Sequence, residues 1–159
     1  MARTTDGIVV SFRGTAGGSP LDWLQNAALF LSSPGGGIKG RIHIGFYRAV
    51  KSLWEPVKSI IKEMLSSGDQ RIFLTGHSKG GALASIAAIM MKQDAQMPDP
   101  THVYSFASPR FGDTEFVNFY DKEINQTSYE ACLDLIPFLP PSQQTMENME
   151  ADMVEMING

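Results

Sequence analysis

A serine lies between two glycines in Gly76-His77-Ser78-Lys79-Gly80, which fits the pattern G-x-S-x-G. An apolar, strand-like run (71–76) precedes it, and an alanine-rich, helix-like segment (80–92) follows. This context predicts a nucleophile elbow, a strained strand-to-helix turn that presents the serine hydroxyl. The alternative is that Ser78 is an ordinary helix N-cap. Strand and helix together favour the nucleophile, and a phosphate-binding loop is disfavoured because Lys79 follows the serine rather than preceding it.

A second hydroxyl follows another apolar run, since Thr15 comes directly after Phe12-Arg13-Gly14. A hydroxyl and an N–H at this point, beside the strand that carries Ser78, could form half of an oxyanion hole. The second donor would be the backbone N–H of Lys79, the residue after the nucleophile. The alternative for Thr15 is a simple turn-forming residue after a glycine.

Asp134 stands among apolar residues in Cys132-Leu133-Asp134-Leu135-Ile136-Pro137. An aspartate in apolar surroundings is costly unless a partner stabilises its charge. It could orient an imidazolium as the acid of a catalytic triad, or it could be a turn residue before Pro137. The sequence places Asp134 at the end of a strand (127–134) in which Cys132 is a buried small hydrophobe.

The segment 16–37 carries apolar residues between flexible ends rich in glycine, serine and proline. We expect its centre, which includes Trp23, Leu24 and Leu31, to form a short helix. Two interpretations stay open: a helix docked in the core, or a mobile lid over an apolar cleft that opens when lipid binds.

These residues need a scaffold, and the chain supplies alternating strand-like and helix-like segments. Strands are predicted at 8–12, 71–76, 102–108 and 127–134, with helices at 46–64, 80–92 and 113–123. The pattern predicts an α/β fold, a parallel sheet with helices on both faces, with function at the carboxyl ends of the strands. The apolar stripe of the first helix comprises Phe46, Val50, Leu53, Val57, Ile60 and Met64. Pro56 should kink or divide that helix.

The composition fits one domain, 1–159, with 43% hydrophobic and 19% charged residues. A net charge of -4 and scattered basic residues argue against nucleic acid as a partner. Three dispersed histidines and one cysteine predict no metal site. No signal peptide or membrane span is apparent, and the single cysteine excludes an internal disulfide, so a soluble and weakly favoured cytoplasmic protein is expected.

Six stretches, in order, give the chain a family resemblance over about Ile8–Pro141. They are VVSFRGT, DWLQN, RIHIGFYRAV, TGHSKGGALA, SFASPRFGD and LDLIPFLPP. The chain resembles the class 3 (fungal-type) triacylglycerol lipases of the α/β-hydrolase fold. The resemblance implies that Ser78 is the nucleophile, Thr15 an oxyanion-hole residue, Trp23 part of the lid and Asp134 the triad acid. It makes Asp113 a structural turn residue.

The resemblance also exposes a gap, because the order in this fold is serine, aspartate, then histidine. All three histidines, His43, His77 and His102, precede Asp134. The resemblance makes His43 structural. The sharp turn should direct His77 away from Ser78, and His102 should lie at the opposite end of the sheet.

Family elements are also missing at both ends, which suggests a fragment, a truncated form or an unusually short member. A sheet cut in this way would expose strand edges and apolar surface and favour self-association.

The sequence therefore predicts lipid-ester hydrolysis through a serine acyl-enzyme, impaired here by the missing histidine. Acyl-glycerol or another lipid ester would be the substrate, with contact to a lipid surface and without metal or organic cofactor. The alternative is a catalytically silent α/β-hydrolase-like domain that binds a lipid or a protein partner.

Overall fold

The computed structural model describes residues 1–14, 31–65, 71–141, 145 and 148. Its main sheet has five strands in the order β1-β2-β5-β6-β7, and a two-stranded sheet pairs β3 with β4. The strands of the main sheet are β1 (Ala2–Thr4), β2 (Gly7–Phe12), β5 (Ile72–His77), β6 (His102–Phe106) and β7 (Gln126–Tyr129). The remaining elements are β3 (Leu31–Ser32), β4 (Ile42–His43), α2 (Ile44–Leu65), α3 (Lys79–Gln93), α4 (Thr114–Glu123) and the short 3₁₀ helix η1 (Ile136–Phe138).

The four central and distal strands β2, β5, β6 and β7 are parallel, and only β1 pairs antiparallel. The predicted parallel sheet is therefore confirmed. Parallel strands end at one common edge, so the segments after Phe12, His77, Phe106 and Tyr129 all leave the sheet there.

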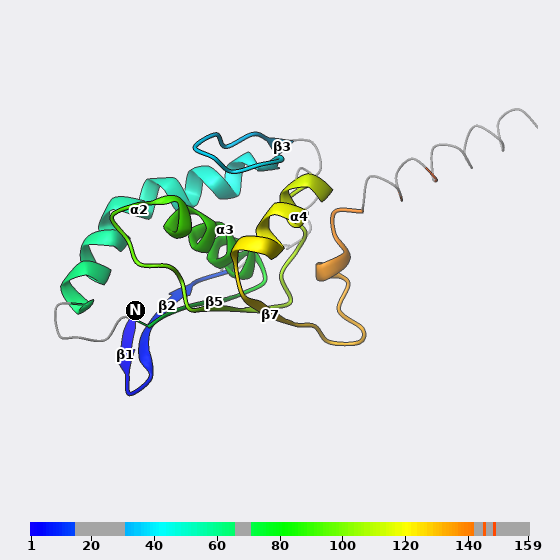
Figure 1. The fold of residues 1–159 in the computed structure, drawn as a ribbon. Coiled ribbons are helices and arrows are strands. Elements are labelled where there is room, and N and C mark those ends of the chain that lie inside the picture. The colour runs from blue at the N-terminus through cyan, green and yellow to red at the C-terminus, as the bar shows by residue number, and fades with distance from the viewer. Residues whose placement is uncertain (15–30, 66–70, 142–144, 146–147, 149–159) are drawn as a thin grey trace, which may run out of the picture.

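The described helices lie on one face of the sheet, whereas the sequence predicted helices on both faces (Figure 1). On the other face, Tyr104, Phe106 and Tyr129 are 36%, 41% and 50% exposed. The rings of Phe106 and Tyr129 stack with centroids 5.0 Å apart.

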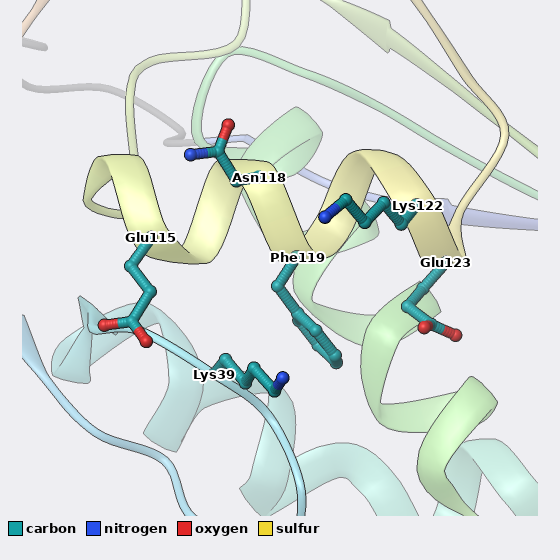
Figure 2. Close-up of a pocket in the computed structure, with 6 residues that line it drawn as sticks. All are labelled: Lys39, Glu115, Asn118, Phe119, Lys122 and Glu123. Carbon is teal, nitrogen blue, oxygen red and sulfur yellow. The ribbon is translucent and has the colours of Figure 1, made fainter.

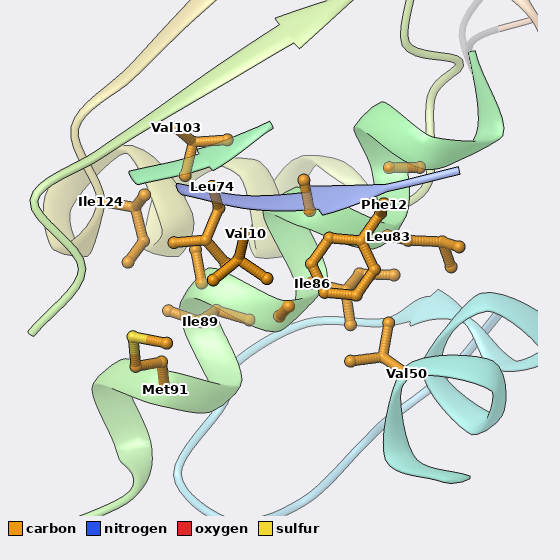
Figure 3. Packing of buried hydrophobic residues seen from close by; sticks show 14 of the residues in the cluster. Val10, Phe12, Val50, Leu74, Leu83, Ile86, Ile89, Met91, Val103 and Ile124 are labelled. Carbon is orange, nitrogen blue, oxygen red and sulfur yellow. The ribbon is translucent and has the colours of Figure 1, made fainter. Parts of the chain in front are cut away.

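The core lies between the sheet and α3, which is almost wholly buried (Figure 3). Alternate residues of β2 and β5, such as Val10 and Leu74, point toward Ile86 and Ile89 of α3. Glycine and alanine are frequent in the first turns of α3, so its backbone can approach the strands closely and bring its first turn against their carboxyl ends.

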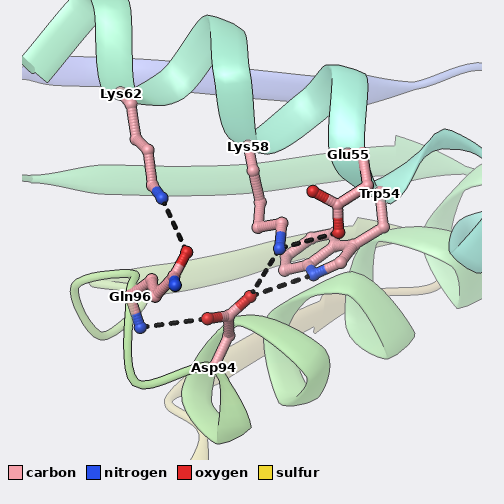
Figure 4. Close-up of polar contacts among 6 residues, drawn as sticks. All are labelled: Trp54, Glu55, Lys58, Lys62, Asp94 and Gln96. Atoms are coloured by element: carbon pink, nitrogen blue, oxygen red, sulfur yellow. Dashed lines mark hydrogen bonds and ion pairs between the residues drawn. The ribbon is translucent and has the colours of Figure 1, made fainter.

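The long helix α2 runs undivided through Pro56, so of the two expected effects, a kink or a division, the division is wrong. Trp54 and Ile61 are buried in place of the expected Leu53 and Ile60, which are 51% and 45% exposed. The indole Nε1 of Trp54 donates to the Asp94 carboxylate at 3.3 Å, and Lys58 forms an ion pair with the same carboxylate at 3.1 Å (Figure 4). These contacts join α2 to the end of α3.

Two further predictions about local structure are wrong. The strand expected over 127–134 ends at Tyr129, and Cys132 is exposed in a turn rather than buried. The last pair of β6 and β7 is Phe106 with Tyr129, and Ala107 then turns at a positive φ of 48°. Because β6 turns away, no partner strand continues beside 130–134, and β7 stops.

The helix expected at 113–123 forms α4, and Asp113 is its N-cap. Its Oδ1 accepts a hydrogen bond from the N–H of Phe116 at 2.9 Å, and its Oδ2 pairs with Arg41 Nε at 3.0 Å. Asp113 is thus the structural residue that the resemblance implied. Leu31 lies in β3 rather than in the helix expected around it. Trp23, Leu24 and the rest of 16–30 lie outside the described residues, and none of the described helices is long and apolar enough to cross a membrane.

Candidate active site

Ser78 lies at the strained turn between β5 and α3, with φ 55° and ψ −130°. Such a backbone conformation is unfavourable for a residue with a side chain and persists only where its surroundings enforce it. The N–H of Ser78 donates to the carbonyl of Phe106 at 2.8 Å, and the N–H of Gly81 donates to the carbonyl of Ser78 at 2.8 Å. The Ser78 side chain makes no N-cap hydrogen bond to α3. Its geometry is therefore that of an elbow rather than of a helix cap.

Glycines allow the chain to pack closely around this turn. A Cβ on Gly76 would lie 2.1 Å from the carbonyl oxygen of Gly80, and one on Gly80 would lie 2.2 Å from the carbonyl oxygen of Phe12. Gly14 lies against the elbow, since its added Cβ would lie 3.7 Å from the Ser78 Cβ. The end of β2 thus packs directly beside Ser78.

Both predicted oxyanion donors, Lys79 and Thr15, adjoin residues of this close packing in the sequence. Lys79 is the first residue of α3, and the N–H groups of a first helical turn have no acceptor within the helix. They also lie at the positive end of the helix dipole, where negative charge is stabilised. Thr15 lies outside the described residues, but it follows Gly14, the neighbour of the elbow.

Asp134 follows the edge strand β7 at the same end of the sheet as Ser78. It is partly exposed, so the expected burial among apolar residues is not found. Its N–H donates to Ala131 at 3.0 Å and its Oδ1 accepts from the N–H of Ile136 at 2.9 Å. These are the bonds of a turn aspartate. Its Oδ2 makes no hydrogen bond within the described part of the chain, so one carboxylate oxygen can accept a further donor.

Two of the three histidines make side-chain hydrogen bonds away from Ser78 and Asp134. His43 Nδ1 accepts a hydrogen bond from the N–H of Phe46 at 3.2 Å, which places the proton on Nε2, and burial lowers the pKa of His43. Nε2 is buried and has no partner among the residues that the structure describes. His102 begins β6, and its Nε2 lies 2.9 Å from Thr127 Oγ1. His77 is exposed at the end of β5.

A hollow among the described residues lies apart from Ser78 and Asp134. It measures about 610 Å³ between one face of α4 and Lys39 (Figure 2). Its lining residues are Lys39, Glu115, Asn118, Phe119, Lys122 and Glu123. None of the predicted site residues lines it. Across the described ranges, no group of three or more His, Cys, Asp or Glu residues could hold a metal ion.

Arg110 contacts the loop of Asp134 and was not singled out from the sequence. Its backbone N–H donates to the carbonyl of Leu139 at 2.8 Å, and its Nη1 donates to the carbonyls of Phe138 and Pro140 at 3.2 and 3.3 Å. Only the position of Arg110, just past the carboxyl end of the strand beside β7, could have indicated this from the sequence.

Comparison with known proteins adds family information to this geometry. The sequence pattern of the family described as Lipase (class 3) matches residues 9–144. A secreted mono- and diacylglycerol lipase 1 of Fusarium solani is 35% identical over 63% of this chain and 30% of its own length. A chloroplastic phospholipase A(1), DAD1, of Arabidopsis thaliana is 31% identical over 94% of this chain and 36% of its own length.

Solved lipase structures share the fold. A Rhizomucor miehei lipase in a propeptide complex superposes with a TM-score of 0.73 at 23% identity, covering 84% of this chain and 43% of that one. A lipase of Rhizopus microsporus var. chinensis gives 0.70 at 24% identity, covering 87% and 48%. The α/β-hydrolase fold is thereby confirmed, and the chain spans about a third of the length of the two curated relatives. One relative is named as secreted and another as chloroplastic, so these names lend no support to a cytoplasmic location.

Proposed function

Because the chain belongs to the class 3 lipase family, we propose that it carries the nucleophile and acid of a lipid-ester hydrolase. Ser78 attacks the acyl carbonyl, the ester C–O bond breaks and the protonated alcohol leaves, and water then hydrolyses the acyl-enzyme to release the acid and regenerate the serine. The N–H of Lys79 and the residue Thr15 stabilise the oxyanion. Asp134 orients the imidazole that moves the proton. The observation that carries the proposal is the positive φ of Ser78 without an N-cap bond.

The 159 residues contain no histidine after Asp134, so we expect the chain alone to turn over esters weakly. In a serine-protease triad, loss of the histidine lowers kcat by a factor on the order of 10⁶. What remains is catalysis by the oxyanion hole and by binding.

Exposed apolar side chains near Asp134 support a lipid substrate and contact with a lipid surface. Leu133, Leu135 and Phe138 are 93%, 72% and 54% exposed on the loop that carries the proposed acid. An acyl chain or a lipid surface would remove this apolar area from water, at a gain of about 25 cal/mol per Å². Two relatives are named as a mono- and diacylglycerol lipase and a phospholipase A(1), and these names agree with a lipid ester as substrate.

Exposed apolar surface elsewhere on the sheet favours self-association. The exposed aromatic face of Tyr104, Phe106 and Tyr129 and the edge of β7, the last strand of the sheet among the described residues, are surfaces that soluble proteins usually cover. We expect this chain, prepared alone, to associate with itself through them.

The test is covalent labelling with a fluorophosphonate probe, with and without added imidazole as an external base. We expect labelling of the parent chain to rise with imidazole, by about tenfold or more at saturation, because a base that accepts the serine proton accelerates attack. Ser78→Ala should abolish labelling. Ser59→Ala, an exposed helix serine distant in sequence from the elbow, should label like the parent.

The alternative, a catalytically silent domain, predicts that Ser78 is not labelled. It remains an alternative because these 159 residues contain no histidine after Asp134. A parent chain that remains unlabelled at every imidazole concentration would contradict the hydrolase proposal. Rapid turnover of short-chain p-nitrophenyl esters that Ser78→Ala abolishes would instead contradict the expectation of weak activity.

A further inference from the structure

The loop 131–140, which carries Asp134, is held to the other described residues by few hydrogen bonds. Pro137 is its only buried residue. Four of its hydrogen bonds are internal, donated by the N–H groups of Asp134, Ile136, Phe138 and Leu139 to other members of the loop. Within the described part of the chain, the hydrogen bonds that reach outside the loop all come from Arg110.

Arg110 belongs to a short segment that also contacts the elbow. At its start, the N–H of Ala107 donates to the carbonyl of Tyr129, the last residue of β7, at 2.8 Å. In its middle, the Cβ of Ser108 lies 2.9 Å from the position that a Cβ on Gly81 would occupy. Gly81 is in the first turn of α3, three residues after Ser78. The segment 107–110 therefore lies between the elbow and the loop of Asp134.

We propose that Arg110 is a positioning residue that holds the loop of Asp134 in register with Ser78. The Nη1 of Arg110 donates to the carbonyls of the two residues that flank Leu139. The backbone N–H of Arg110 donates to the carbonyl of Leu139 itself. A charged donor makes stronger hydrogen bonds than a neutral one, and two carbonyl acceptors on one guanidinium nitrogen fix the loop in direction as well as distance. The inference rests on the proposed function, in which the place of Asp134 determines where the imidazole lies.

Amide hydrogen exchange, measured by NMR on the full chain, tests the positioning directly. The reporters are the N–H groups of Asp134, Ile136, Phe138 and Leu139. We expect Arg110→Ala to accelerate their exchange about tenfold, the change that loss of about 1.4 kcal/mol of hydrogen bonding gives. Arg110→Lys, which keeps a charged donor, should accelerate it less, by about threefold.

The matched control is Arg41→Ala. Arg41 is also an exposed arginine, but its guanidinium binds Asp113 at the N-terminus of α4, so the loop amides should exchange as in the parent. Exchange in Arg110→Ala within twofold of the parent would overturn the proposal. If Arg110→Ala does not fold, Arg110→Lys and Arg110→Gln carry the same comparison, and parent-like exchange in both would overturn it.

A double-mutant cycle then separates positioning of Asp134 from general stabilisation. Arg110→Ala should slow the imidazole-dependent labelling of Ser78 about tenfold when Asp134 is present, and less than twofold when it is replaced in Asp134→Asn. Equal slowing in both backgrounds would show that Arg110 does not act through Asp134. If Ser78 labels under no condition, the proposed function fails, and the exchange comparison alone decides whether Arg110 positions the loop.

Discussion

The close packing at the elbow makes Gly76→Ala a severe test of the geometry around Ser78. The added Cβ would lie 2.1 Å from the carbonyl oxygen of Gly80 and 2.7 Å from the backbone nitrogen of Gly81. Both are backbone atoms, so no side chain can rotate away, and the first turn of α3 must move. Overpacking of this kind costs roughly 1–3 kcal/mol, and we expect a loss of about 3 kcal/mol here.

The matched control is Gly36→Ala, the same chemical change in open space. Gly36 has a φ of 63° and no heavy atom within 4 Å of an added Cβ. Only the left-handed conformation is penalised, by about 1 kcal/mol. In both variants the substitution also restricts the unfolded chain, which is worth roughly 0.4–1 kcal/mol in favour of folding. Gly76→Ala should therefore be the less stable variant by about 2 kcal/mol.

Urea unfolding followed by circular dichroism measures the difference. With a slope of about 2 kcal/mol per M, the midpoint of Gly76→Ala should fall about 1 M below that of Gly36→Ala. Labelling of Ser78, normalised to the folded fraction, should also decline in Gly76→Ala alone, because relief of the clash displaces the elbow. Equal midpoints for the two variants, or a Gly76→Ala loss below 1 kcal/mol, would refute the argument.

Two further predictions concern polar contacts in and around the core. The N–H of Gln96, together with Lys58, holds the pKa of the Asp94 carboxyl below its ordinary value despite partial burial. The contribution of Asp94 to folding stability is therefore present above pH 4 and is lost as the pH falls further. Asp94→Asn should cost about 1 kcal/mol at pH 7, and urea midpoints measured from pH 7 to pH 2 should converge with those of the parent. Tyr120 donates from its buried hydroxyl to Gln126 Oε1 at 2.6 Å, so Tyr120→Phe should also cost about 1 kcal/mol by urea unfolding; an unchanged midpoint would show that this bond contributes nothing net.

The spacing of apolar residues in α2 shows how far a sequence pattern predicts which side chains of a helix are buried. Apolar residues at steps of three and four predicted the helix and its buried face, and Phe46 and Val50 are buried as expected. The pattern could not choose between the neighbours Ile60 and Ile61, because both are isoleucine. Adjacent helix positions differ by about 100°, and only the place of the packed sheet and α3 decides which neighbour is buried.

Near Asp134 the sequence was a poorer guide for a different reason. An apolar run such as the one around Cys132 is typical of a strand, but a strand also needs a partner. The partner strand β6 ends at Phe106, where Ala107 takes a positive φ. There the N–H of Ala107 donates to the carbonyl of Tyr129, a contact between residues far apart in sequence, and so the end of β7 could not be predicted from its own residues.

The elbow could be predicted because its requirements are local, whereas the contacts of Arg110 could not. A strand, two glycines and a helix within a dozen residues are sufficient to indicate the turn at Ser78. Arg110, by contrast, lies 24 residues before Asp134 in sequence, and its acceptors are backbone carbonyls, which any residue supplies. Side-chain types therefore carry no signal for that contact.

The two halves of the proposed site thus differ in their structural support. Ser78 is fixed by the carbonyl of Phe106 and by backbone contacts among β2, β5 and α3, which belong to the most buried part of the fold. Asp134 lies on a loop beyond an edge strand, with Pro137 as its only buried residue. Local opening is easiest where few apolar contacts must be broken. The loop of Asp134 should accordingly open at a lower free energy than the elbow. The place of the proposed acid, rather than that of the proposed nucleophile, should then limit how often the two are aligned.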